Sequence, residues 1–301
     1  MPTLFVATIG SGLLRSDDLG ERWLKEPGLP SDARCSALCA TAGDLLVGGH
    51  DVVYRRTGRA WSELVLPAGA GEVTAVAVVD GAILAGARGL GLLRSTDGGR
   101  SWTAGGPAPP GADVPAFTAL LPNPAVTGEV WAGVQGGGVL TSPDGGRGWS
   151  DVSDGLPSRD VRALAWSSGG VLLAALASDG VTIWRSARWI ASTFAPADRC
   201  CLALAARADD AGVLYCGFGD GAGGGVAFSR DGGRSWEDCA GLPSLPGGVR
   251  SVATTADRPE LVAAVSAGGT VALSHDGAVS WAAVLATGAD TRAVACVIDQ
   301  G

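Results

Sequence analysis

The sequence predicts an all-β protein: a seven-bladed β-propeller of four-stranded blades that spans residues 1–301 as a single domain. Three observations predict it. Short apolar bursts alternate with Gly, Asp and Pro, which is typical of many short strands joined by tight turns. A motif recurs along the whole chain at a nearly constant interval. Finally, the two ends of the chain carry complementary parts of one repeat unit.

The recurring motif is Ser-x-Asp-x-Gly-x-Ser-Trp, and we call its five copies the boxes. They occupy residues 16–23, 95–102, 142–149, 229–236 and 274–281. The fifth copy has Ala278 where the others have Gly. Two weaker copies, at residues 54–61 and 184–189, keep only the strand pattern and the final tryptophan.

The seven closing tryptophans set the size of the repeat. They lie 38 to 47 residues apart and are Trp23, Trp61, Trp102, Trp149, Trp189, Trp236 and Trp281. A repeat of this length holds four short strands, which is the content of one propeller blade. The chain length then predicts seven blades.

The termini predict how the ring closes. The chain begins on what aligns with the second strand of a blade, at residues 4–8, and ends on an innermost strand at residues 293–298. We expect the C-terminal strand to complete the N-terminal blade, because this pairing removes the free sheet edges that promote aggregation.

Composition excludes some classes of partner. The net charge is −8, Lys25 is the only lysine, and no run of basic residues occurs, so nucleic acid is not an expected partner. No apolar run approaches the length of a membrane-spanning helix, and the N-terminus does not resemble a signal peptide. We therefore expect a cytoplasmic protein without membrane contact, whose seven cysteines are reduced thiols.

The boxes resemble those of the Asp-box (BNR) propeller superfamily, which includes sialidases, xyloglucanase-type glycosidases and photosystem assembly factors of the Ycf48 kind. The resemblance covers the whole chain at the level of blades. It implies the propeller fold strongly and function only weakly, because this fold carries many activities.

Within the boxes, Asp97, Asp144 and Asp231 are expected to stabilise a turn by accepting backbone N–H groups, while glycine supplies a positive φ. The alternative is a calcium loop. Each box offers at most two carboxylates, however, whereas calcium takes six to eight oxygen ligands. We expect a structural role on the face away from the site, and no metal or cofactor.

The resemblance implies that ligands bind on the face around the central channel. Aligning the innermost strands gives one residue per blade at this face: Ser36, Thr74, Thr118, Arg162, Leu202, Arg250 and Arg292. The three arginines fall in blades five, seven and one, on one side of the channel. They predict an anion site, since guanidinium groups bind carboxylate, sulfate or phosphate through paired hydrogen bonds. The alternative is inter-blade salt bridging with carboxylates that precede these strands: Glu72, Asp113, Asp160, Asp198 and Asp290.

Loops between second and third strands add further residues to this face: His50, Asp51, Arg88, Gln135, Asp179 and Asp220. We include Arg88, Asp51 and Gln135 among the anion-binding candidates, although each taken alone fits a solvated loop residue better than a ligand contact. The glycine-rich segment at residues 217–225 resembles a phosphate cradle. No helix is expected after it, so we interpret it as a flexible loop.

The sequence gives little support for an enzymatic function. Sialidases use a tyrosine nucleophile and an Arg-Ile-Pro motif; here Tyr54 and Tyr215 lie in predicted strands and the motif is absent. Xyloglucanase-type enzymes hold substrate between two propellers, whereas one is predicted here. The only histidines are His50 and His275. We therefore predict a non-catalytic binding or interaction module for an anionic small molecule or a partner protein, with no catalytic residue assigned. The alternative is a glycoside hydrolase-like or other enzyme acting on a carbohydrate or anionic small molecule.

Overall fold

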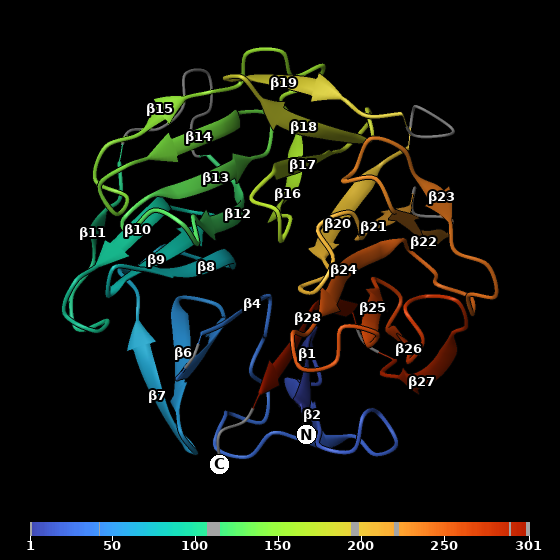
Figure 1. Ribbon diagram of the computed structural model, residues 1–301. Helices are drawn as coiled ribbons and strands as arrows, with labels where there is room; N and C mark the ends of the chain where they lie inside the picture. The colour runs from blue at the N-terminus through green and yellow to red at the C-terminus, as the bar shows by residue number, and fades with distance from the viewer. Residues whose placement is uncertain are drawn as a thin grey trace.

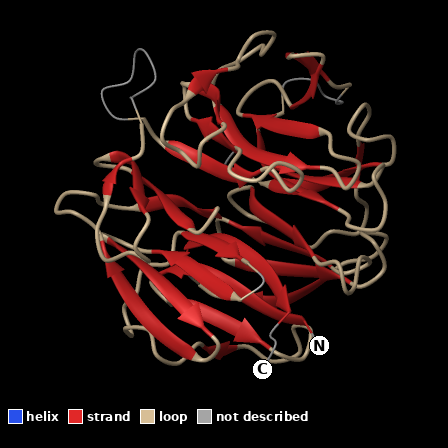
Figure 2. Cartoon of the chain, turned by 60° about the vertical axis from the view of Figure 1, so that its left-hand side comes forward, coloured by secondary structure: helices blue, strands red, loops and turns tan. Residues whose placement is uncertain are grey.

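The computed structural model describes residues 2–41, 43–106, 115–193, 199–219, 223–288 and 290–298. These residues form seven four-stranded antiparallel sheets arranged around a central channel (Figure 1). Figure 2, turned to one side, shows strands and connecting loops but no helix in this part of the chain. Accordingly, the described residues contain no helix that is long and apolar enough to cross a membrane. The predicted seven-bladed propeller is confirmed.

Each blade runs from an innermost strand at the channel to an outermost strand at the rim. Blades 1 to 3 comprise β28 (Asp290–Ile298), β1 (Pro2–Ile9), β2 (Leu13–Ser16) and β3 (Leu24–Lys25); β4 (Ala37–Ala40), β5 (Asp44–Gly48), β6 (Val52–Thr57) and β7 (Ala60–Val65); and β8 (Val73–Val79), β9 (Ala82–Ala87), β10 (Gly91–Ser95) and β11 (Thr103–Ala104). Blades 4 and 5 comprise β12 (Phe117–Pro122), β13 (Val130–Val134), β14 (Gly138–Ser142) and β15 (Ser150–Asp151); and β16 (Val161–Trp166), β17 (Leu172–Leu176), β18 (Val181–Arg185) and β19 (Arg188–Ala191). Blades 6 and 7 comprise β20 (Cys201–Ala206), β21 (Leu214–Gly219), β22 (Gly224–Ser229) and β23 (Glu237–Asp238); and β24 (Val249–Thr254), β25 (Val262–Ser266), β26 (Thr270–Ser274) and β27 (Ala282–Ala286).

The ring closes in blade 1, where strands from both ends of the chain pair. β28 lies antiparallel to β1 along its whole length, with Leu4 opposite Cys296 and Val6 opposite Val294. The predicted closure by the C-terminal strand is therefore confirmed. It covers the edge of β1 that would otherwise stay unpaired.

The core lies between neighbouring blades. The second strands are buried on both faces, as at all six positions of β9. Phe5 of blade 1 and Val47 of blade 2 belong to one buried cluster, and Leu84 of blade 3 and Val130 of blade 4 belong to another. Because each sheet buries two faces, one against each neighbour, the blades hold a fixed angle around the channel.

The boxes form the turns between third and fourth strands, and their predicted structural role is confirmed. In the second box Ser95 Oγ donates to Asp97 Oδ1 and accepts the Gly99 N–H, both at 2.8 Å. Asp97 also accepts the N–H and the hydroxyl of Ser101, at 2.9 and 2.6 Å. These donors, the Ser101 hydroxyl first, hold the pKa of Asp97 well below its usual range. Gly99 itself has φ +90°, as its place in the turn requires.

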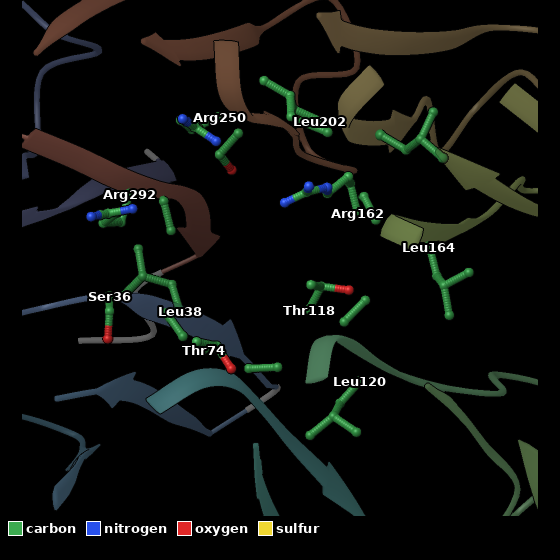
Figure 3. A pocket seen from close by; sticks show the side chains of 18 of the residues that line it. Ser36, Leu38, Thr74, Thr118, Leu120, Arg162, Leu164, Leu202, Arg250 and Arg292 are labelled. Carbon is green, nitrogen blue, oxygen red and sulfur yellow. The ribbon is translucent and has the colours of Figure 1, made fainter. Parts of the chain in front are cut away.

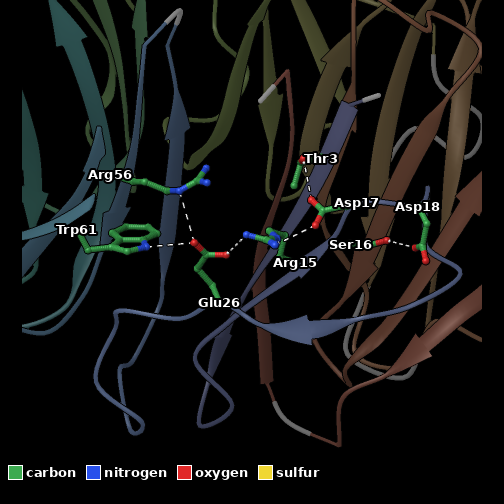
Figure 4. Close-up of polar contacts among 8 residues, drawn as sticks. All are labelled: Thr3, Arg15, Ser16, Asp17, Asp18, Glu26, Arg56 and Trp61. Carbon is green, nitrogen blue, oxygen red and sulfur yellow. Dashed lines mark hydrogen bonds and ion pairs between the residues drawn. The ribbon is translucent and has the colours of Figure 1, made fainter. Parts of the chain in front are cut away.

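Blades 2 and 5 lack a box and turn differently. In blade 5 Ser186 and Ala187 form a tight turn with φ of 50° and 59°. In blade 2 the closing Trp61 instead donates its ring N–H to the buried Glu26 of blade 1, at 3.2 Å. Arg15 and Arg56 also reach this carboxylate, at 3.1 and 3.4 Å (Figure 4). A charged cluster thus joins the first two blades where no box is present.

Candidate functional site

The innermost strands carry a β-bulge at the same place in successive blades. In β16, for example, Val161 pairs with Leu176 and Ala163 with Ala175, so Arg162 between them is the extra residue. Equivalent register shifts leave Thr74, Thr118, Leu202, Arg250 and Arg292 unpaired. A bulge redirects the side chain of its extra residue. Here it places one residue per blade at the channel mouth, as the alignment of innermost strands predicted.

These residues, together with Ser36, form a ring around a cavity of about 270 Å³. Viewed into the channel, Arg292, Arg250, Leu202 and Arg162 follow one another along one arc (Figure 3). We call Arg162, Arg250 and Arg292 the arginine arc. The structure thus brings together the three arginines that the sequence singled out, from blades 5, 7 and 1.

Two members of the arginine arc are paired with carboxylates of their own strands. Arg162 Nη2 lies 2.8 Å from Asp160 Oδ2, and Arg292 Nη2 lies 2.6 Å from Asp290 Oδ2. Both pairs join residues two apart in sequence, so they are not the inter-blade bridges considered as the alternative. Of the other carboxylates named for such bridges, Glu72 pairs with Arg88, while Asp113 and Asp198 lie outside the described residues.

Arg250 differs from the other two arginines. Gly248 stands where they have aspartate, and within the described residues no carboxylate lies within ion-pair distance of Arg250. Its side chain is exposed at the mouth. Arg250 therefore keeps its hydrogen-bond donors for an external acceptor.

The remaining arc of the ring consists of three hydroxyl residues that link neighbouring blades; we call it the hydroxyl arc. Ser36 Oγ donates to the Val73 carbonyl at 2.7 Å. Thr74 and Thr118 repeat the contact with the next blade at 2.6 and 2.8 Å; the acceptors are the carbonyls of Phe117 and Val161. A hydroxyl has one proton to donate. Because that proton is used between blades, the hydroxyl arc offers a ligand only acceptor oxygens.

Below the ring the described side chains along the channel are almost all aliphatic, while the innermost strands turn their unpaired backbone edge towards it. Each ring residue is followed by a small residue and then by a leucine or valine, as in Ala119-Leu120 and Ala163-Leu164. Among the described side chains of this wall, Ser251 alone carries a hydroxyl. The leucines and valines are largely buried in the clusters between blades, as Leu120 and Leu164 show, so they expose little apolar surface to the channel.

The loop candidates do not join the arginine arc. Arg88 lines a separate cavity of about 520 Å³ with Arg34, His50 and Glu72, and its Nε lies 3.1 Å from Glu72 Oε2. Asp51 lies beside it.

Asp51 accepts the Gly71 N–H at 2.6 Å, and its carboxylate is 3.7 Å from His50 Nε2. Gln135 is exposed in the turn after β13 and lines neither cavity. Asp179 accepts the hydroxyl of Ser178 at 2.7 Å, and Asp220 lies outside the described residues. The interpretation of residues 217–225 as a flexible loop is wrong at both ends of the segment: Gly217–Gly219 belong to β21 and pair with β22, which begins at Gly224, and residues 220–222 lie outside the described residues. As expected, no helix follows the segment.

The sequence analysis missed one group near the mouth, the thiol of Cys200. Burial raises the pKa of this thiol, and the positive charges of Arg162 and Arg250 act in the opposite direction. The thiol therefore stays protonated at neutral pH and adds no charge to the mouth. In the sequence, the only indication that Cys200 lies near the mouth was its position directly before the strand that starts at Cys201-Leu202.

In the described ranges of the chain no three side chains of His, Cys, Asp or Glu gather as a metal ion would need.

No protein-family model matches the sequence, and no curated protein does either. Solved structures do match. The GH74 xyloglucanase from Xanthomonas campestris superposes with a TM-score of 0.71 at 18% identity, over 97% of this chain and 52% of that one. The GH74 enzyme of Niastella koreensis gives 0.64 at 15%, over 98% and 66%. This chain therefore spans less than two thirds of the length of either enzyme.

The structure of Ycf48 bound to a D1 peptide gives a TM-score of 0.61 at 19% identity, over 85% of this chain and 83% of that one. At these identities the likeness concerns the fold alone. Hydrolases and binding proteins both occur among the similar propellers, so the comparisons show the propeller fold and do not decide between catalysis and binding.

Proposed function

We propose that this protein is a non-catalytic binding module that takes a small carboxylate at the arginine arc. One observation carries the proposal: three guanidinium groups lie at one side of a cavity mouth, and Arg250 has no carboxylate partner among the described residues. The chain has only 22 basic residues against 30 acidic ones, so three arginines at one mouth stand out from its overall charge.

The electrostatics of the mouth support an anionic ligand. Asp160 and Asp290 balance Arg162 and Arg292, which leaves Arg250 as the excess positive charge among the described groups of the ring. A guanidinium donates to both oxygens of a carboxylate at once, and such charge-assisted bonds contribute about 1.5–3 kcal/mol. A bound carboxylate would also reduce the repulsion between neighbouring guanidinium groups.

Two related structures suggest other ligands. The Ycf48 structure holds a peptide, so a peptide carboxylate is a second form that the anion could take. The GH74 enzymes make glycoside hydrolysis the competing proposal. Hydrolysis requires a pair of carboxylic groups free to act as acid and base. At this mouth Asp160 and Asp290 are both held by arginines, which favours binding.

The five boxes support membership of the Asp-box (BNR) lineage, since all five use the same Ser-to-Asp hydrogen bond at 2.8 to 2.9 Å.

We also propose a cytoplasmic location for the protein. Burial raises the pKa of Cys35 and Cys239 to about 12, and such thiols are unreactive structural groups that suit a reducing compartment.

The test is calorimetric titration of the whole chain with acetate, butyrate, sulfate and phosphate. We expect Arg250→Gln to weaken carboxylate binding about tenfold or more, which corresponds to the loss of one charge-assisted pair. Arg88→Gln is the matched control, because Arg88 carries the same charge at the same face but lines the other cavity. Equal losses in both variants, or no loss in Arg250→Gln, would refute the proposal.

A further inference from the structure

The outer rim of blade 2 carries a strand edge unlike those of the other blades. β7 is the last strand of its sheet and lies at the rim (Figure 1). It has six residues and pairs with β6 without a register shift. An edge strand presents backbone groups that can pair with another chain, so proteins usually shorten, distort or cover such edges.

Each of the other six blades uses one of these devices in the described part of the chain. The outermost strands β3, β11, β15 and β23 have only two residues each. In β27 the register with β26 shifts at Val284, which distorts the edge. In blade 5 the edge of β19 is covered, because the Trp189 N–H donates to the Asp154 carbonyl at 3.0 Å. Among these outermost strands, β7 alone is long, regular and uncovered.

Every second residue of β7 turns its backbone N–H and carbonyl away from the sheet. Just beyond the strand, the Leu66 N–H donates to the Asp51 carbonyl at 2.9 Å. Bonded and non-bonded pairs alternate along an antiparallel ladder, so the even-numbered residues of β7 bond to β6. Trp61, Glu63 and Val65 therefore face outwards. In the described part of the chain no backbone hydrogen bond to another segment uses their groups, so one more strand can pair there.

The side chains along this edge select the partner strand. Glu63 is exposed and is the only charged residue of β7. The arginines of β6 do not neutralise it, since Arg55 pairs with Asp44 and Arg56 with Glu26. Side chains that lie directly opposite each other in an antiparallel pair interact on the same face of the sheet. A basic residue opposite Glu63 would therefore be favoured.

The residues on either side of Glu63 are apolar. Trp61 is half-buried and Val65 is 67% exposed, and both side chains lie on the same side of the strand as Glu63. Apolar residues opposite them would bury this surface. The complementary strand thus has a basic residue with an apolar residue two positions away on each side.

A second copy of β7 fits this edge less well. In the antiparallel register that pairs all the outward residues of both copies, Glu63 would lie opposite Glu63. Like charges directly opposite each other destabilise a sheet. We propose that β7 is a docking edge for an extended segment of a partner protein that has this apolar-x-basic-x-apolar pattern. The edge lies at the rim, so it is separate from the arginine arc at the channel.

The first test uses the whole chain and the peptide acetyl-Thr-Val-Thr-Lys-Thr-Val-Thr-amide. Its blocked ends leave no carboxylate for the arginine arc to bind. We expect the peptide to slow backbone hydrogen exchange at Trp61, Glu63 and Val65, and to leave the even-numbered residues of β7 unchanged, since these already bond to β6. No protection of the three residues in a large excess of peptide would overturn the proposal.

Two methylated peptides separate backbone pairing from contact between side chains. A methyl group on the lysine backbone nitrogen removes an N–H that would donate to the Glu63 carbonyl, so calorimetric affinity should fall about tenfold or more. A methyl group on the backbone nitrogen of the next threonine is the matched control, because that N–H points away from β7. Equal losses with both peptides would overturn strand addition.

Variants of the edge complete the test. Val65→Pro removes one outward N–H without breaking a bond to β6, a position where an edge strand tolerates proline, and should weaken peptide binding about tenfold. Val65→Thr keeps the N–H and should retain most of the affinity. Glu63→Gln should weaken binding several-fold at low salt and less at high salt. Thermal unfolding checks that each variant is folded.

Three results would count against a partner strand at this edge. Equal peptide affinity in Val65→Pro and Val65→Thr would refute backbone pairing. Affinity that is unchanged in Glu63→Gln would refute the basic residue of the partner. Protection of the outward N–H groups that rises with protein concentration in the absence of peptide would show that a second copy is the occupant.

Discussion

The two arcs of the channel mouth occupy equivalent positions at the start of their innermost strands but use them differently. In blades 2 to 4 the residue at this position is Ser or Thr, and its hydroxyl bonds to the carbonyl of the next blade. In blades 5, 7 and 1 it is arginine, which pairs with a carboxylate of its own strand or, as Arg250, with none in the described residues. The hydroxyl arc joins blades to each other, whereas the arginine arc makes no such link among the described contacts.

This difference separates stability from binding within one ring. A hydroxyl that bridges blades contributes to the folded state and offers little to a ligand. An arginine at the same position contributes little to blade contacts and directs its donors towards the cavity. Substitutions in the hydroxyl arc should therefore change the free energy of unfolding, whereas substitutions in the arginine arc should change ligand affinity.

The largest effect on folding is expected in the hydroxyl arc. Replacing Thr74 and Thr118 together by valine keeps their shape and removes both inter-blade hydrogen bonds. We expect the double variant to lose about 2 kcal/mol of unfolding free energy, about 1 for each bond, in denaturant titration. Carboxylate affinity should not change.

Thr103→Val is the matched control for that variant. The Thr103 hydroxyl is exposed and bonds at 3.2 Å to Arg94 within its own blade, so its loss should alter stability by only a few tenths of a kcal/mol. If the double variant were as stable as this control, the two arcs would not differ in the way described. A fall in carboxylate affinity comparable to that of Arg250→Gln would also remove the distinction.

A smaller effect is expected within the arginine arc. Arg162→Gln and Arg292→Gln each leave a carboxylate without its partner, and the pairs are partly exposed, with arginine side chains 26% and 34% accessible. We expect each variant to lose up to about 1 kcal/mol of unfolding free energy, the upper range for such pairs. Arg250→Gln should leave stability nearly unchanged, because it breaks no described pair. A larger loss in Arg250→Gln than in Arg162→Gln would mean that Arg250 is mainly structural.

The sequence predicted the positions of the ring residues better than it predicted their hydrogen bonds and ion pairs. Repeats at blade spacing aligned the seven ring positions, since six blades bulge at the same place and Ser36 precedes the innermost strand of blade 2 at the equivalent position. The spacing Asp160-x-Arg162 also indicated the ion pair between these two residues, because side chains two residues apart lie on the same side of an extended chain. The inter-blade role of Thr118 was not predictable, because its acceptor is a backbone carbonyl 43 residues away.

Loop residues were the weakest part of the prediction. Alignment grouped Asp51, Arg88 and Gln135 with the ring residues, but loop side chains follow local backbone geometry. Asp51 has φ 59°, in the left-handed region, and its carboxylate accepts a neighbouring N–H instead of facing the channel. Strand residues repeat in direction from blade to blade, whereas loop residues do not.

The smallest effect on stability is expected from substitutions in the boxes. The boxes lie at the turns between the outer strands, so these substitutions should not depend on which arc the blade contributes to. Asp97 in blade 3 and Asp276 in blade 7 make the same contacts, and the hydroxyls of Ser101 and Ser280 are the main cause that lowers their pKa values, that of Asp276 to about 2. A pKa depressed from about 3.9 contributes stability above that pH and loses it as the pH falls through the folded value. Asp97→Asn and Asp276→Asn should therefore be slightly destabilised near neutral pH, and the difference from the wild type should shrink as the pH falls below about 4, sooner for Asp276 because the pKa of Asp97 is lower still, in denaturant titrations across this range. A difference that stays constant down to pH 2 in both variants would show that the carboxylate charge does not stabilise the boxes.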